Sequence, residues 1–99
     1  MYPVAVPDHE FATRLGTALK AALLYREVTT EELAARAGVS VESVRRWVRG
    51  DTNMSAADAS TVADVLDVPA ELLLRPPTSR AALFGMLSAW DDSRRDAPR

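Results

Sequence analysis

The segment from residue 28 to residue 50 constrains the fold of this 99-residue chain most strongly, because it encodes two short helices joined by a tight turn. Thr29 followed three residues later by Glu32 is the pattern of a capping box, in which each side chain accepts a backbone N–H at a helix start. Gly38 then tolerates the left-handed backbone of a helix end, and Ser40 is a suitable N-cap. We therefore predict one helix after Thr29 and a second after Ser40.

The second of these helices has one apolar and one polar side. Val44 and Trp47 lie three residues apart, which places both on the side that faces a core, and an indole at this spacing is expected to pack rather than to bind. The opposite side faces water and carries Glu42, Ser43, Arg45, Arg46 and Arg49. That side is the one available to a partner.

In this register the chain resembles the Cro and lambda-repressor-like helix-turn-helix regulators, also called XRE-like. Members of that family have a T-x-E-E-L-A block, then G-V-S, then a short helix ending in R-W-x-x-G. The matching residues, in ungapped register, are Thr29, Glu31, Glu32, Leu33, Ala34, Gly38, Val39, Ser40, Arg46, Trp47 and Gly50. The resemblance covers about Phe11 to Leu74 and implies an all-α fold, a five-helix domain that binds double-stranded DNA.

Three further helices complete the expected domain. A long helix capped by Asp8 and ending near Arg26 comes first. After the two short helices, Ser55 and Asp58 repeat the capping-box pattern before a fourth helix, and Pro69 suits the first turn of a short fifth helix.

A sixth helix is expected after Pro76 and Pro77, with apolar residues at helical spacing: Leu83, Phe84, Met86, Leu87 and Trp90. A helix of this length is marginal alone in water, so its apolar stripe must dock on something. Packing on its own subunit, swapping onto or pairing with a second copy as a homodimer interface, and lining a ligand pocket are the alternatives. The predicted organisation is a loose arm, the helix-turn-helix domain, the C-terminal helix and a disordered tail, at residues 1–7, 8–75, 78–92 and 93–99.

The resemblance implies which residues would contact DNA. Family members commonly touch bases from positions that match Val41, Glu42 and Arg46, and Arg45 adjoins them. Arginine can donate two hydrogen bonds to guanine, glutamate can accept one from cytosine, and valine can pack on the thymine methyl group. The predicted base-contacting residues are Val41, Glu42, Arg45 and Arg46, and the predicted phosphate-contacting residues are Thr30, Ser40, Ser43, Arg49, Thr52 and Asn53.

Composition excludes several other functions. The chain has no cysteine and one histidine, so we expect no disulfide, no metal site and no cofactor. Its apolar stretches are shorter than the ~20 residues of a membrane-spanning helix, so a cytoplasmic protein without a membrane partner is expected. No paired carboxylates, nucleophile with a base, or phosphate loop occurs at a useful spacing, and no enzymatic reaction is expected.

Charge is distributed unevenly along the chain, whose net charge is −2. From Arg36 to Arg49 there are four arginines and one glutamate, whereas residues 56–73 carry four acidic residues and no base. This asymmetry would orient the domain on a duplex while leaving its sequence-independent affinity modest.

The chain departs from the family's usual residues at Thr30, Val48, Asp51 and Met54. An acid at position 51, close to the expected phosphates, should weaken binding, and Val48 or Met54 could serve a subunit contact or a shifted loop. The function these observations favour is a transcriptional repressor that binds an inverted-repeat operator as a homodimer. The alternative is an antitoxin-like or adaptor module that binds a protein partner through its C-terminal helix.

Overall fold

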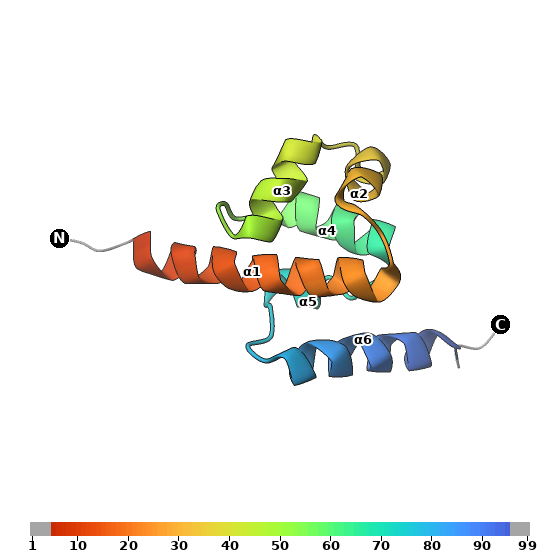
Figure 1. The fold of residues 1–99 in the computed structure, drawn as a ribbon. Helices are drawn as coiled ribbons and strands as arrows, with labels where there is room; N and C mark the ends of the chain where they lie inside the picture. Colours follow the sequence, from red (N-terminus) through yellow and green to blue (C-terminus); the bar gives the residue numbers. More distant parts are fainter. Residues whose placement is uncertain (1–4, 96–99) are drawn as a thin grey trace.

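The computed structural model describes the backbone of residues 5–95 and the side chains of residues 10–94, and within that part of the chain every regular element is a helix. The helices are α1 (Ala5–Arg26), α2 (Thr30–Ala37), α3 (Val41–Arg49), α4 (Ala56–Leu66), α5 (Glu71–Leu74) and α6 (Arg80–Arg95). Figure 1 shows α1 crossing the middle of the molecule, with α2, α3 and α4 on one side of it and α6 along the other. The predicted all-α fold is confirmed.

The two ends of the helical region differ from the sequence-based prediction. Helix α1 begins at Ala5, so Asp8 lies inside the helix instead of capping it, and residues 5–7 are not part of a loose arm. Proline at position 7 is compatible with this because the N–H groups of a first helical turn have no intrahelical partner. Helix α6 runs to Arg95, into the segment expected to be a disordered tail. Residues 1–4 and 96–99 lie outside the described part.

The predicted helix caps around α2 and α3 are present. Thr29 Oγ1 accepts a hydrogen bond from Glu32 N at 3.0 Å, and Thr29 N donates to Glu32 Oε1 at 2.9 Å, which completes the capping box. Ser40 Oγ accepts from Ser43 N at 3.1 Å. Gly38 and Gly50 end their helices with positive φ angles of 73° and 79°. These local signals determine where both short helices begin and end.

The cap of α4 is simpler than predicted. Ser55 Oγ accepts from Asp58 N at 3.0 Å, which is one half of a capping box. No reciprocal bond from Ser55 N to the Asp58 carboxylate is formed among the described residues. The short fifth helix begins at Glu71 with Ala70 at its N-cap, so Pro69 precedes the helix instead of lying in its first turn.

One apolar core joins all six helices. Leu15 and Leu19 of α1 are fully buried in a cluster to which every other helix contributes, with Leu33, Val44, Val62 and Leu72 among its members. Because α1 contacts α3, α4, α5 and α6, it is the element on which the others are assembled. None of the helices in residues 5–95 is long and apolar enough to cross a membrane.

Helix α6 docks on its own subunit through Leu83 and Leu87, which are buried against α1 and the rest of the core. This is the first of the three alternatives considered for its apolar stripe. Leu83 and Leu87 are buried within this one copy of the chain, and the homodimer interface at the α6 stripe stays a prediction. Of the other stripe residues, Phe84 is exposed, and Met86 and Trp90 are half-buried.

A polar cluster fastens the C-terminal half of α6 to the domain. The Arg26 guanidinium donates to the carbonyl oxygens of Leu66 at 3.0 Å and Asp67 at 2.7 Å, and to the Asp91 carboxylate at 2.9 Å. The hydrogen bond to Asp91 raises the pKa of Arg26 further above its usual value. Trp90 Nε1 also donates to Asp67 Oδ1 at 3.3 Å. The bonds of Arg26 join residues 40 or more positions apart, and nothing in the sequence pattern indicated them.

Candidate nucleic-acid interface

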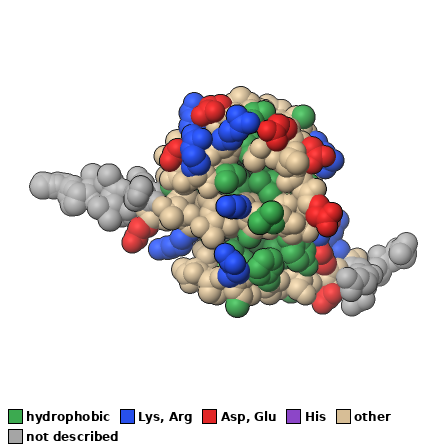
Figure 2. All heavy atoms as spheres, in the orientation of Figure 1, with side chains coloured by type: hydrophobic (Ala, Val, Ile, Leu, Met, Phe, Trp, Pro, Cys, Tyr) green, Lys and Arg blue, Asp and Glu red, His purple; other side chains and the backbone are tan. Residues whose placement is uncertain are grey.

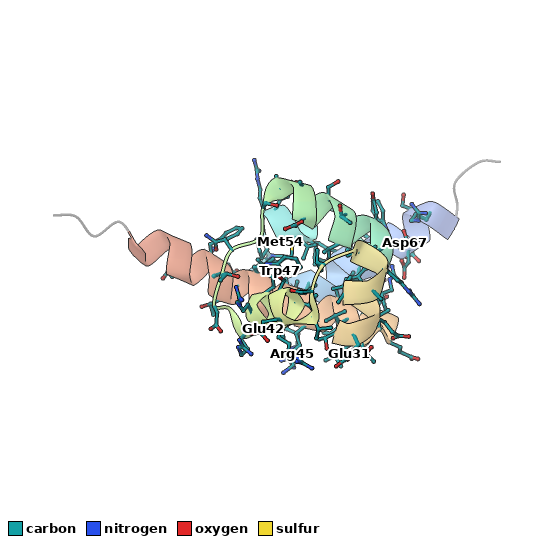
Figure 3. All side chains as sticks on the ribbon, turned by 90° about the horizontal axis from the view of Figure 1, so that it is seen from above. Glu31, Glu42, Arg45, Trp47, Met54 and Asp67 are labelled. Carbon is teal, nitrogen blue, oxygen red and sulfur yellow. The ribbon has the colours of Figure 1, made fainter. Side chains whose placement is uncertain are left out.

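Helix α3 is held by the two side chains that the sequence assigned to the core. Val44 is fully buried and Trp47 is buried to 95%, so both point into the molecule as predicted. Figure 3 shows Trp47 directed inward and Arg45 directed away from the body of the protein. The opposite side of α3 is therefore presented to solvent.

The C-terminal end of α3 lies directly against the backbone of α1. A Cβ atom built on Gly16 would be 2.6 Å from the carbonyl oxygen of Val48 and 2.8 Å from that of Trp47, closer than real Cβ contacts come. A Cβ on Gly50 would lie 3.1 Å from the Cα of Thr13. Only glycine at position 16 permits this approach, and sequence reasoning missed it. A glycine inside an otherwise apolar helix stripe is the signal that could have indicated it.

The four predicted base-contacting residues share one surface of α3. Glu42, Arg45 and Arg46 are exposed, each with about half of its side chain accessible, and Val41 is half-buried at the start of the helix. Arg49 is equally exposed one turn further on. We call Glu42, Arg45, Arg46 and Arg49 the α3 surface.

Every arginine of the α3 surface is paired with a carboxylate, which the sequence did not predict. Arg45 Nη2 lies 3.2 Å from Glu31 Oε2 of α2, and Arg46 Nε lies 3.8 Å from Glu42 Oε2. Arg49 contacts Glu42 Oε2 at 3.4 Å and Asp51 Oδ2 at 2.9 Å. The hydrogen bond to Asp51 raises the pKa of Arg49.

Two acidic residues of α2, Glu31 and Glu32, are stabilised in their charged form. The pKa of Glu31 is lowered by its own backbone N–H, then by the Thr30 hydroxyl, with Arg45 contributing less. The pKa of Glu32 is lowered mainly by the backbone N–H of Thr29. Both carboxylates are therefore ionised at neutral pH, beside the N-terminus of α2.

The six predicted phosphate-contacting residues lie in three places. Thr30 is at the start of α2, where its hydroxyl donates to Glu31 Oε1 at 3.0 Å. Ser40 and Ser43 are at the start of α3, with their hydroxyl oxygens 3.0 Å apart. Arg49 is at the end of α3, and Thr52 and Asn53 are in the loop that follows. Arg49 belongs to the α3 surface, Ser43 lies between two of its residues in sequence, and the other four lie before or after it.

The charge of this region is balanced. Residues 30–53 contain four arginines and four carboxylates, because Glu31, Glu32 and Asp51 join Glu42. The excess of positive charge expected between Arg36 and Arg49 is thus offset by acids at the two edges of the same region. Long-range attraction to phosphates is correspondingly small.

Two of the departures from the family pattern lie away from the α3 surface. Val48 is half-buried and packs against the core, on the side of α3 next to α1. Met54 packs partly into the core from the loop before α4 (Figure 3). Both side chains have contacts within the subunit.

The chain is similar to known proteins in both sequence and structure. A family model described as helix-turn-helix matches residues 19–73, more than half of the chain. The crystal structure of a hypothetical transcription factor, NHTF, from Neisseria is similar to this one, with a TM-score of 0.65 and 26% sequence identity. The similarity covers 84% of this chain and 97% of that one. No curated protein matches the sequence.

Proposed function

The chain belongs to the Cro and lambda-repressor-like (XRE) family of helix-turn-helix proteins, and we propose that it is a repressor that binds an inverted-repeat operator in double-stranded DNA. Family membership and the likeness to a hypothetical transcription factor support a DNA-binding regulator. The observation that carries the proposal is the orientation of α3, with Val44 and Trp47 buried and Arg45 and Arg46 on the outside. Repression would follow from occupancy of the operator.

In this proposal α3 enters the major groove, which is wide enough for one helix. Arg46 donates two hydrogen bonds to a guanine, and Glu42 accepts from a cytosine amino group or holds Arg46 in position. Val41, at the first turn of α3, packs against a thymine methyl group. Thr30, Ser43 and Asn53 donate to phosphates on either side and set the register of the helix.

The ion pairs of the α3 surface give the binding its selectivity. A phosphate must compete with Glu31, Glu42 or Asp51 for each guanidinium, and the four carboxylates of residues 30–53 repel the duplex. Sequence-independent binding is therefore weak, since it depends on the number of phosphates neutralised. A guanine edge offers two acceptors in the plane of the guanidinium and competes better than a single phosphate oxygen.

Two copies would read the two half-sites about one helical turn, ~34 Å, apart. Because Leu83 and Leu87 are covered by their own subunit, contacts between copies cannot use the whole apolar stripe of α6. Phe84, Met86 and Trp90 are the stripe residues with accessible surface. The mass of the complex on a duplex with one or two half-sites, measured by sizing with light scattering, tests this stoichiometry.

The test begins with selection of bound duplexes from a random pool, followed by titration of the selected duplex with variants. Arg46→Ala should weaken the binding free energy for that duplex by roughly 1 to 3 kcal/mol and relax the sequence preference at one base pair. Arg75→Ala is the matched control, because Arg75 is an exposed arginine at the end of α5, outside the α3 surface. Equal binding of wild type and Arg46→Ala to every duplex would remove Arg46 from the base-reading residues.

A further inference from the structure

Exposed apolar side chains gather at one place on the molecule. Among the described residues, the large hydrophobic side chains that are exposed are Leu24 at 70%, Tyr25 at 38%, Phe84 at 40% and Leu74 at 41%. Three of these four are on the facing sides of α1 and α6, where the Tyr25 and Phe84 rings are 6.1 Å apart. A grouped apolar surface with a polar rim marks an interaction site more often than scattered exposed residues do.

A groove runs beside this cluster. It has a volume of about 400 Å³ and lies between α1, the end of α3 and the start of α6. Its floor is formed by Gly16, Ala21 and Leu83, and its walls by Leu24, Val48 and Phe84. Figure 2 shows hydrophobic side chains over the middle and lower part of this face, below the charged side chains that gather at the top. We call this cavity the α1–α6 groove.

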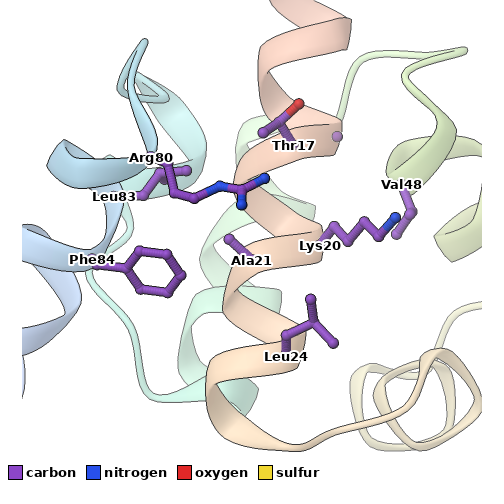
Figure 4. A pocket seen from close by; sticks show the side chains of 9 residues that line it. Thr17, Lys20, Ala21, Leu24, Val48, Arg80, Leu83 and Phe84 are labelled. Carbon is purple, nitrogen blue, oxygen red and sulfur yellow. The ribbon is translucent and has the colours of Figure 1, made fainter.

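Two cations stand over the groove. Figure 4 shows Lys20 extending from α1 toward Val48 and Arg80 extending from α6 toward α1. Neither cation forms an ion pair with a carboxylate in the described part of the chain, whereas all three arginines of α3 do. The groove therefore combines apolar walls with uncompensated positive charge.

This charge favours a partner other than a second copy. A two-fold contact centred on the groove would bring Lys20 and Arg80 of one copy against the same residues of the other, and like charges in a desolvated contact are destabilising. The groove is open to solvent, and the exposed apolar surface extends beyond it from Leu24 and Phe84, which line it, to Tyr25, whose ring contacts Phe84. This suits a ligand larger than the cavity better than a small enclosed one. An amphipathic helix laid in a groove between two helices has this shape.

We propose that the α1–α6 groove binds an acidic amphipathic helix of another protein. The apolar side of that helix would pack on Leu24, Tyr25 and Phe84, and its carboxylates would pair with Lys20 and Arg80. The proposal does not depend on DNA binding, because none of these residues belongs to the α3 surface.

The test uses two synthetic helical peptides of about five turns (~18 residues), each with one apolar side made of leucine and phenylalanine. One peptide carries glutamates on both edges of its apolar side, and the other carries lysines at the same positions. Fluorescence anisotropy with the full chain should show that the acidic peptide binds at least about tenfold more tightly than the basic one. Amide chemical shifts of the wild-type chain should change around Leu24 and Phe84 when the acidic peptide is added.

Matched variants distinguish binding at this groove from non-specific binding of the peptides. Leu24→Ser should lower the affinity for the acidic peptide by about tenfold. The double variant Lys20→Glu with Arg80→Glu should bind the basic peptide more tightly than the acidic one. Leu74→Ser and Arg75→Glu, which change an exposed leucine and an exposed arginine at α5, should leave both affinities unchanged. Thermal unfolding of each variant checks that it remains folded.

Five results would overturn the proposal. The acidic and basic peptides could bind equally, or neither could bind. The α5 control variants could have the same effect as the groove variants. Leu24→Ser could dissociate a self-associated chain without affecting the peptide, which would make a second copy the occupant. Decanoate, a small molecule with an apolar chain and one carboxylate, could saturate the groove while the acidic peptide leaves the amide shifts of the groove residues unchanged. The groove would then be a site for a small carboxylate.

Discussion

Replacement of Gly16 by alanine tests the packing that holds α3 in place. Alanine is favoured over glycine in a helix interior by about 1 kcal/mol. Its Cβ would lie 2.6 Å and 2.8 Å from two backbone carbonyl oxygens of α3, which cannot rotate away as a side chain can. Overpacking costs about 1 to 3 kcal/mol, and contact with backbone on both sides places this site at the upper end. We therefore expect a net loss of about 2 kcal/mol.

Thermal unfolding followed by circular dichroism measures this loss. At about 4 to 8 °C per kcal/mol for a domain of this size, Gly16→Ala should lower Tm by about 8 to 16 °C. Gly85→Ala is the control, because nothing lies within 4 Å of a Cβ at that helical glycine, and it should raise stability by about 0.5 to 1 kcal/mol. If Gly16→Ala is as stable as Gly85→Ala, the close approach of α1 and α3 is not a constraint and the reasoning fails.

Three further predictions concern charged residues. Arg26→Ala should lower the free energy of unfolding by about 2 kcal/mol, because two carbonyls and a carboxylate lose a mostly buried partner, whereas Arg75→Ala should change it by less than about 0.5 kcal/mol in urea unfolding. Glu32 has a lowered pKa in the folded chain, so its charged form stabilises the folded state. This contribution is fully present above the ordinary pKa of about 4.3 and is lost as pH falls through the lower pKa of the folded state. The stability difference between wild type and Glu32→Ala should therefore be constant near neutral pH and shrink in acid; a difference that grows in acid contradicts this. Glu42→Gln frees Arg46 and Arg49 from a shared carboxylate, and should tighten binding to random duplex DNA and steepen its salt dependence by about one unit of log–log slope. An unchanged slope would mean that these arginines do not reach phosphates.

Local signals in the sequence were sufficient to predict the short helices. The capping residues form their hydrogen bonds with backbone groups only three or four positions away, so the caps follow from local chain geometry. These residues are Thr29, Glu32, Gly38, Ser40 and Gly50. The buried and exposed sides of α3 follow in the same way from the spacing of its apolar residues. This is why the fold class, and the surface on which Arg45 and Arg46 lie, could be predicted without a structure.

Contacts between distant residues could not be predicted in this way. The Arg26 cluster joins α1 to Leu66 and to Asp91, which are 40 and 65 positions away. The pair of Arg45 with Glu31 depends on how α2 and α3 cross, and the groove depends on where α6 docks. The start of α1 was misplaced for a different reason: Asp8 suits an N-cap, but a helix can begin earlier when a proline lies in its first turn.

The most direct test of the account is to map which amides of the chain respond to a duplex selected from a random pool. Titration of the isotope-labelled chain at modest ionic strength should shift the amides of α3, the start of α2 and the loop at residues 51–53, with the largest changes near Arg46. Shifts confined to α1 and α6, or equal responses to the selected duplex and to a scrambled one, would contradict the claim that α3 reads DNA.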